Sequence, residues 1–141
     1  MVSEKPWFIK FYAPWCGHCQ RLAPTWAEFA KLHEDDLNVA RVDCTTDGGK
    51  PLCSTMEVRG YPTLLFFPGK NDIKEGDKPQ AIKYSGGRVI HEFENFAFAG
   101  GWKEVGADSY IPFSSDGLEK WGRWAAQQKM YYMRAVDQAW G

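Results

Sequence analysis

Long apolar runs, a surplus of one charge sign and abundant cysteine are all missing from this chain of 141 residues. No uninterrupted apolar stretch approaches the ~18 residues that a membrane-spanning helix needs, and the start, MVSEKPWFIKF, lacks the order of a signal peptide. Lys and Arg number 17 against 18 Asp and Glu, so the net charge of −1 gives no electrostatic drive toward nucleic acid or an anionic membrane. Four cysteines are too few for a disulfide-stapled mini-protein, which leaves them as candidates for chemistry.

The composition indicates one folded domain with a sizeable core. Hydrophobic residues make up 44% and aromatic residues 16% of the sequence, but the length does not accommodate two full domains. We expect an α/β domain over residues 1–99, followed at 100–141 by a loop and an aromatic-rich C-terminal helical extension. The aromatic residues of this extension fit core packing, a protein interface or the approach to a membrane span, and packing is our working hypothesis.

Hydrophobic periodicity divides the chain into strands and helices. Short apolar runs rich in aromatic and β-branched residues predict buried strands, and apolar residues spaced by three and four predict amphipathic helices. The expected strands are 7–12, 38–43, 64–67 and 80–84, the expected helices are 19–33, 51–57, 88–98 and 118–140, and a loop is expected over 100–116. A strand, a helix and a second strand in succession indicate a parallel βαβ unit.

The most informative motif is Cys16-Gly17-His18-Cys19, which comes directly after the first expected strand. A cysteine in the first turn of a helix has a lowered pKa, because oriented N–H groups favour its thiolate. We therefore assign Cys16 as the attacking thiol and Cys19, on the same helical face, as the resolving thiol. Gly17 lets a partner backbone approach, and a charged His18 beside the thiolate favours the reduced form, which makes the pair a stronger oxidant.

Other uses of the cysteines are weaker. Cys16 and Cys19 could form half of a zinc site with Cys44 and Cys53, but the second pair lacks the spacing of a zinc knuckle, so no metal is expected. A haem attachment needs His directly after the second cysteine, where Gln20 stands. Cys44 and Cys53 fit either two buried thiols or a structural disulfide.

Two segments carry a resemblance to a known family. Phe11 to Cys19 (FYAPWCGHC), with Val58 to Thr63 (VRGYPT) downstream, resembles a catalytic thioredoxin-like domain of the protein disulfide isomerase family, over about residues 7–98. The segments IKFY, LAPTW, VDCT and SGGR are most similar to the endoPDI-type members, which have three thioredoxin domains.

The resemblance implies a thioredoxin-like fold, a mixed central sheet flanked by helices. It implies exchange of thiols and disulfides in unfolded or misoxidised client proteins, without a bound cofactor, in the lumen of the endoplasmic reticulum. Glutathione or an oxidase or reductase would be the redox partner. From the sequence alone, Trp15 beside the nucleophile is expected to contact substrate.

Roles for several further residues follow from the resemblance. Tyr61-Pro62 is expected to be a cis peptide that faces the cysteines, with neighbouring backbone that pairs with an extended substrate. Arg88 is expected to swing toward the resolving thiol and lower its pKa. The resemblance also favours a disulfide between Cys44 and Cys53.

Lys10 departs from the pattern, because many thioredoxin-like domains have a buried Asp or Glu at that place. A cation near Cys19 would favour its thiolate, whereas a desolvated Lys10 could lose its proton and then accept one. Both alternatives make Lys10 a residue that tunes Cys19.

The second departure lies at the ends, because the family fold normally has a strand and a helix before the strand at Trp7, and only six residues precede it. One sheet edge is then expected to be bare, and either residues 118–140 cover it or two chains form a homodimer through it. The short start suggests a piece of a longer chain, in which any membrane tether would lie elsewhere.

Two rival functions differ from an isomerase. One is a cytosolic thioredoxin-type reductase, which His18 disfavours. The other is a client-binding adaptor or chaperone module with weak redox turnover, which the intact Cys16 and Cys19 disfavour.

Overall fold

The computed structural model describes residues 5–72 and 80–112. A five-stranded sheet has the order β2-β1-β3-β4-β5. Strand β1 pairs in parallel with β2 and antiparallel with β3, and β4 pairs antiparallel with both β3 and β5, so the sheet is mixed. The strands are β1 (Trp7–Tyr12), β2 (Asn38–Asp43), β3 (Thr63–Phe67), β4 (Gln80–Tyr84) and β5 (Tyr110–Pro112). The helices are α1 (Gly17–Leu32), α2 (Lys50–Thr55) and α3 (Ile90–Phe98), with 3-10 turns at Lys70–Asp72, Gly101–Lys103 and Ala107–Ser109.

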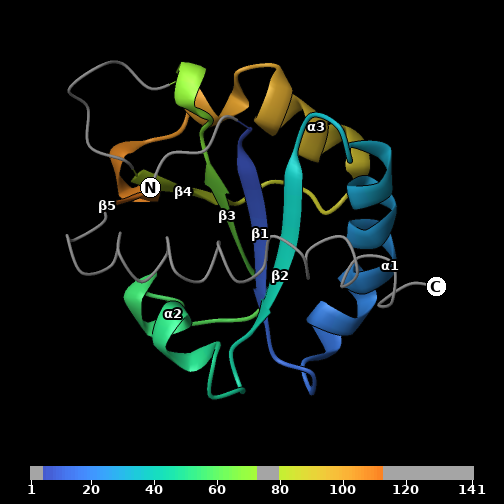
Figure 1. The fold of residues 1–141 in the computed structure, drawn as a ribbon, viewed down its shortest axis with the longest axis vertical. Helices are drawn as coiled ribbons and strands as arrows, with labels where there is room; N and C mark the ends of the chain where they lie inside the picture. Colours follow the sequence, from blue (N-terminus) through green and yellow to red (C-terminus); the bar gives the residue numbers. More distant parts are fainter. Residues whose placement is uncertain (1–4, 73–79, 113–141) are drawn as a thin grey trace.

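Helices cover both faces of this sheet. Helices α1 and α3 lie together along one face, whereas α2 lies on the other side (Figure 1). The mixed sheet flanked by helices confirms the predicted thioredoxin-like architecture. Among the helices of the two described ranges, none combines the length and apolar character needed to cross a membrane.

The core explains why β1 is apolar at every position but Lys10 and the half-buried Tyr12. Phe8 on this central strand is fully buried, and its ring meets Trp26 of α1 at 5.1 Å, Phe66 of β3 at 5.6 Å and Phe93 of α3 at 6.0 Å, in each case edge to face. Such contacts join the sheet to both helices of this face, and aromatic pairs of this geometry stabilise by more than their buried area alone. The central strand therefore holds α1 and α3 against this face of the sheet.

The loop predicted over residues 100–116 is wrong at its centre. Tyr110–Pro112 forms β5, with Ile111 opposite Ala81 and Tyr110 opposite Ile82 of β4. The strand is too short to show an alternating pattern, and a neighbouring strand supplies its pairing. The predicted helix over 118–140 lies outside the described residues, and the division of the chain at residues 99 and 100 stays a prediction.

The predicted bare edge corresponds to the side of β2, which ends the strand order among the described residues. Covering of this edge by residues 118–140, or dimerisation through it, stays a prediction. The other end of the order is β5.

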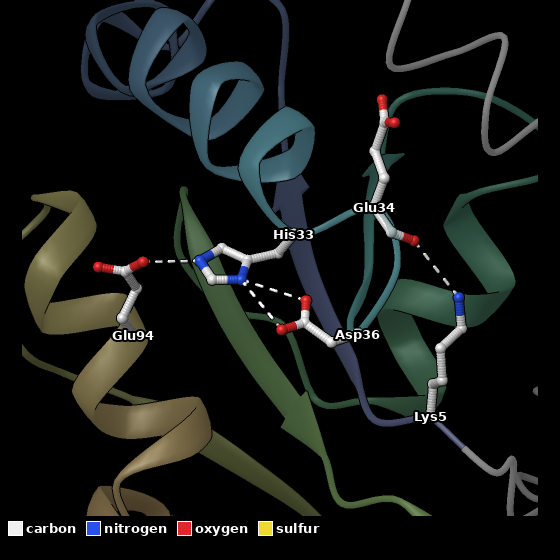
Figure 2. Close-up of polar contacts among 5 residues, drawn as sticks. All are labelled: Lys5, His33, Glu34, Asp36 and Glu94. Carbon is white, nitrogen blue, oxygen red and sulfur yellow. Dashed lines mark hydrogen bonds and ion pairs between the residues drawn. The ribbon is translucent and has the colours of Figure 1, made fainter.

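His33 joins the two helices of one face at the end of α1. Its Nδ1 lies 3.2 Å from Oδ1 of Asp36, and its Nε2 lies 2.7 Å from Oε2 of Glu94 on α3 (Figure 2). The imidazole ring also lies 5.2 Å from the ring of Phe29 and 4.8 Å from that of Phe98. This cluster ties α1 to α3 at the end of α1 opposite Cys16.

Candidate active site

Cys16 caps the N-terminus of α1. The chain leaves β1 at Tyr12 and turns, with the N–H of Cys16 donating to the carbonyl of Ala13 at 3.1 Å. The Sγ atom of Cys16 then accepts a hydrogen bond from the N–H of Cys19 at 3.4 Å. The helix begins at Gly17, two residues before the predicted start, because a capping cysteine satisfies an N–H group that otherwise has no helical partner.

The two thiols are reduced, buried and unlike in acidity. The hydrogen bond from the Cys19 thiol, followed by the backbone N–H groups of Cys19 and His18, lowers the pKa of Cys16. Burial, followed by the hydrogen bond to Cys16, raises the pKa of Cys19. Cys16 is therefore the thiol that ionises first, which is what an attacking nucleophile requires, and Cys19 is held protonated beside it.

Gly17 and His18, between the cysteines, are exposed. A Cβ atom at Gly17 would meet only Nη1 of Arg21, at an ordinary contact distance of 3.5 Å, so packing alone does not require glycine there. The Nδ1 atom of His18 lies 2.8 Å from Nη2 of Arg21. His18 helps to lower the pKa of Cys16 through a hydrogen bond from its backbone N–H.

Lys10 is buried in β1, with 2% of its surface exposed, directly opposite Arg41 of β2. Its Nζ lies 5.3 Å from the centre of the Tyr12 ring. Burial, with a smaller effect from the positive charge of Arg41, lowers the pKa of Lys10 to about 8. The positive charge of Lys10 in turn acts to lower the pKa of Cys19, so the structure couples the two groups electrostatically.

A hydrophobic surface lies beside the nucleophile. Trp15 is 71% exposed, and its ring packs edge to face on that of Tyr61 at 5.7 Å. The Tyr61-Pro62 peptide is cis, and the carbonyl of Tyr61 accepts a hydrogen bond from the Cys16 thiol at 3.5 Å. The structure thus brings Trp15, Tyr61 and Pro62 together with Cys16.

Arg88 is exposed just before α3. Its positive charge helps to lower the pKa of Cys16, as the smallest of the contributions, and is not among the causes that shift Cys19. The expected movement of Arg88 toward the resolving thiol stays a prediction.

Cys44 and Cys53 are joined by a disulfide between the end of β2 and α2. The N–H of Cys44 donates to the carbonyl of Tyr12 at 2.9 Å, at the point where β1 leads into the active-site turn. Bridged sulfurs cannot be thiolate ligands, so these residues do not complete a zinc site with Cys16 and Cys19. Within the parts of the chain that the structure describes, no group of three or more His, Cys, Asp or Glu side chains is placed to hold a metal ion.

Sequence reasoning missed Arg21 and Arg41. Arg21 stands three residues after His18 on the expected helix, a spacing that places two side chains together and could have identified the contact. Arg41 lies opposite Lys10 only through the register of the parallel strands, for which the sequence gives no local signal.

Comparisons with known proteins agree with this fold. A family model described as Thioredoxin matches residues 1–96. The chain is 47% identical over 99 residues to the protein disulfide-isomerase-like protein EhSep2 of Emiliania huxleyi, covering 69% of this chain and 41% of that protein. It is 42% identical over 97 residues to the Thioredoxin domain-containing protein 5 homolog of Drosophila melanogaster, covering 67% of this chain and 21% of that protein.

Among solved structures, the J-Trx1 fragment of ERdj5 is similar with a TM-score of 0.57 and 35% identity, covering 73% of this chain and 46% of that one. The chain spans less than half the length of the two curated relatives. The match over most of its length, with a Cys-x-x-Cys pair at the start of a helix, shows that the chain belongs to the thioredoxin family.

Proposed function

We propose that this chain catalyses thiol–disulfide exchange in protein substrates, as a protein disulfide isomerase-type domain. The observation that carries the proposal is the opposite shift in the pKa values of two neighbouring thiols, Cys16 lowered and Cys19 raised, beside exposed Trp15, which packs on Tyr61. The names of the two curated relatives support the same chemistry.

In the reducing direction the Cys16 thiolate attacks one sulfur of a substrate disulfide. A Cys16–substrate disulfide forms, the substrate S–S bond breaks, and one substrate thiolate leaves with the electron pair. Cys19 then loses its proton and attacks Cys16, which releases the second substrate thiolate and forms the Cys16–Cys19 disulfide. The substrate gains two electrons and the cysteine pair loses two.

Oxidation of a substrate dithiol runs through the same steps in reverse, and isomerisation follows when the released substrate thiolate attacks another substrate disulfide before Cys19 acts. The backbone at Tyr61-Pro62 and the ring of Trp15 would hold an extended substrate across Cys16. Glutathione or a partner oxidase or reductase would restore the pair.

Lys10 would tune the resolving step. A buried cation favours the Cys19 thiolate, and a neutral lysine amine can take the proton that Cys19 must lose. Replacement of Lys10 by Glu should change both the titration of Cys19 and the rate at which the mixed disulfide decays. If both the Cys19 titration and this rate were unchanged, the role of Lys10 would be abandoned.

We infer that the chain acts in the endoplasmic reticulum lumen on misoxidised or unfolded clients. The Cys44–Cys53 disulfide supports an oxidising compartment, where such bridges persist. Similarity to the thioredoxin-containing fragment of ERdj5 supports the same inference.

A client-binding adaptor with weak turnover is the second candidate, and the 71% exposure of Trp15 favours it. A large aromatic surface of this kind binds clients without chemistry. In that case Cys16→Ser would bind unfolded clients as well as the wild-type protein does. The substitution would also remove little exchange activity, because the wild-type protein would have little.

Equilibration in graded glutathione buffers, followed by alkylation and mass mapping of all four cysteines, tests these functions together. A Cys16–Cys19 potential near about −180 mV supports the isomerase, whereas one near about −270 mV indicates a reductase. A pair that never exchanges indicates the adaptor. Cys19→Ser should accumulate a mixed disulfide at Cys16, and Cys16→Ser, its matched control, should accumulate none.

A further inference from the structure

A hydrogen bond in the first turns of α1 constrains the His18 side chain. Nη2 of Arg21 lies 2.8 Å from Nδ1 of His18, at the helical spacing that brings side chains together. A guanidinium group can only donate hydrogen bonds, so Nδ1 must be the acceptor and carries no proton. The contact therefore fits the tautomer of His18 that carries its proton on Nε2.

This geometry conflicts with a simple role for His18 as a cation beside the thiolate. A proton on Nδ1 would break the hydrogen bond and place a second positive charge beside Arg21. The Cys16 sulfur interacts with the Cys19 N–H, the Cys19 thiol and the Tyr61 carbonyl. Arg21 and the Cys16 thiolate therefore make opposite demands on His18.

We propose that Arg21 is a positioning residue that holds His18 in the neutral Nε2–H form and thereby limits how strongly the reduced Cys16–Cys19 pair is stabilised. The inference rests on the proposed function, because it concerns the redox potential of the same pair. Release of His18 from Arg21 allows an imidazolium to form next to Cys16. The reduced form then gains stability, and the pair becomes a stronger oxidant.

The effect is modest because both side chains are exposed. Interactions between exposed charged groups change equilibria by about two- to fivefold. For a two-electron couple this corresponds to about 9–20 mV. A change of this size is well resolved in glutathione equilibrations.

The decisive experiment is a double-mutant cycle on the full chain. Arg21→Met removes the charge and the donors but keeps an unbranched side chain, and we expect it to raise the glutathione equilibrium constant toward the reduced pair by about two- to fivefold. In a His18→Gln background the same substitution should lack this increase. Any direct influence of Arg21 on Cys16 is present in both backgrounds, so the difference between them isolates the part that acts through His18. Lys31→Met is the matched control, since Lys31 is an exposed cation in the last turn of the same helix.

Ring ¹⁵N chemical shifts of His18 give a second readout that a structural role for Arg21 would not move. We expect the neutral Nε2–H form in the wild-type protein near pH 6.5 and a larger imidazolium fraction in Arg21→Met. A protonated Nδ1 in the wild-type protein, or an equal change in potential with and without His18, would overturn the proposal. Failure of Cys16 and Cys19 to exchange in every variant would instead refute the proposed function, and the ring signals would still decide whether Arg21 holds the tautomer.

Discussion

Lys10 places an ionisable amine inside the sheet, and its protonation is coupled to folding. Its pKa in the folded protein is about 8, against 10.5 for a lysine in water, with burial as the main cause. Between these two values the unfolded chain binds a proton that the folded chain does not bind, so stability rises with pH in this window. Below about pH 8 both the folded and the unfolded chain bind this proton, so the folded protein contains a buried charge and the gain in the free energy of unfolding is lost.

The free energy of unfolding of the wild-type protein, relative to that of Lys10→Met, should therefore rise by about 3 kcal/mol between pH 8 and 10.5. Urea denaturation of both proteins at a series of pH values measures this difference, and titrating groups that do not interact with Lys10 cancel between them. Lys83→Met, a substitution of an exposed lysine on β4, is the control and should show no such trend. A flat difference for Lys10→Met would contradict the lowered pKa.

The residues of the site divide by what kind of signal marks them. Cys16, Cys19 and Trp15 could be predicted because a local spacing next to a strand places them at a helix start. The position of Pro62 came from a resemblance, since nothing local brings it to Cys16. The pairing of Lys10 with Arg41 could not be predicted, because parallel register depends on the whole βαβ unit.

At the scale of elements, the His33 cluster is a contact between α1 and α3 that the sequence does not reveal. A carboxylate only accepts hydrogen bonds, so Asp36 and Glu94 are both satisfied when the ring carries both protons (Figure 2). His33→Ala removes both polar contacts and the ring packing on Phe29 and Phe98, and we expect it to lower the free energy of unfolding by about 1–2 kcal/mol.

Urea denaturation with an unchanged m-value tests this expectation. His91→Ala, at an exposed position on α3, is the matched control and should change stability by less than about 0.5 kcal/mol. The alkylation rate of Cys16 should be unaffected by either substitution, because His33 lies at the opposite end of α1. Equal losses in the two variants would show that the cluster adds nothing specific.

The disulfide connects β2 to α2 across a sequence separation of nine residues. Closing a loop of this length reduces the entropy of the unfolded chain and is worth about 2–3 kcal/mol. The double variant Cys44→Ala/Cys53→Ala should lose about this much stability in non-reducing urea denaturation, while Cys16 still exchanges with glutathione. Unchanged stability would mean that a cost of the disulfide in the folded state cancels its effect on the entropy of the unfolded chain.

The elements that could be predicted are those with enough residues to show a period. Both α1 and β1 are long and regular, and β1 was predicted with its observed bounds. The three residues of β5 show no such pattern, and their conformation depends on β4, a distant segment of the chain. Tertiary pairing, and not local propensity, therefore decides this part of the fold.

At the scale of the whole molecule, β5 makes residues beyond α3 part of the same core. Trp102 lies against the ring of Phe66 at 5.8 Å, and the hydroxyl of Tyr110 donates to the carbonyl of Trp102 at 3.3 Å. Strand β5 lies along β4 at the end of the sheet opposite β2 (Figure 1). A boundary directly after α3 would cut through this packing.

A chain that ends at Phe98 should accordingly be less stable than one that ends at Pro112, by about 3 kcal/mol or more, because it loses the buried contacts of Trp102 and the pairing of β5 with β4. Urea denaturation of both shortened chains and of the full chain measures the difference, and Trp102→Ala in the chain ending at Pro112 separates the ring from the strand. Cys16 should still exchange with glutathione in any variant that folds, since Cys16 caps α1 and Cys19 lies within this helix. Equal stability of the two shortened chains would show that residues 99–112 add little to the fold and that the domain ends with α3.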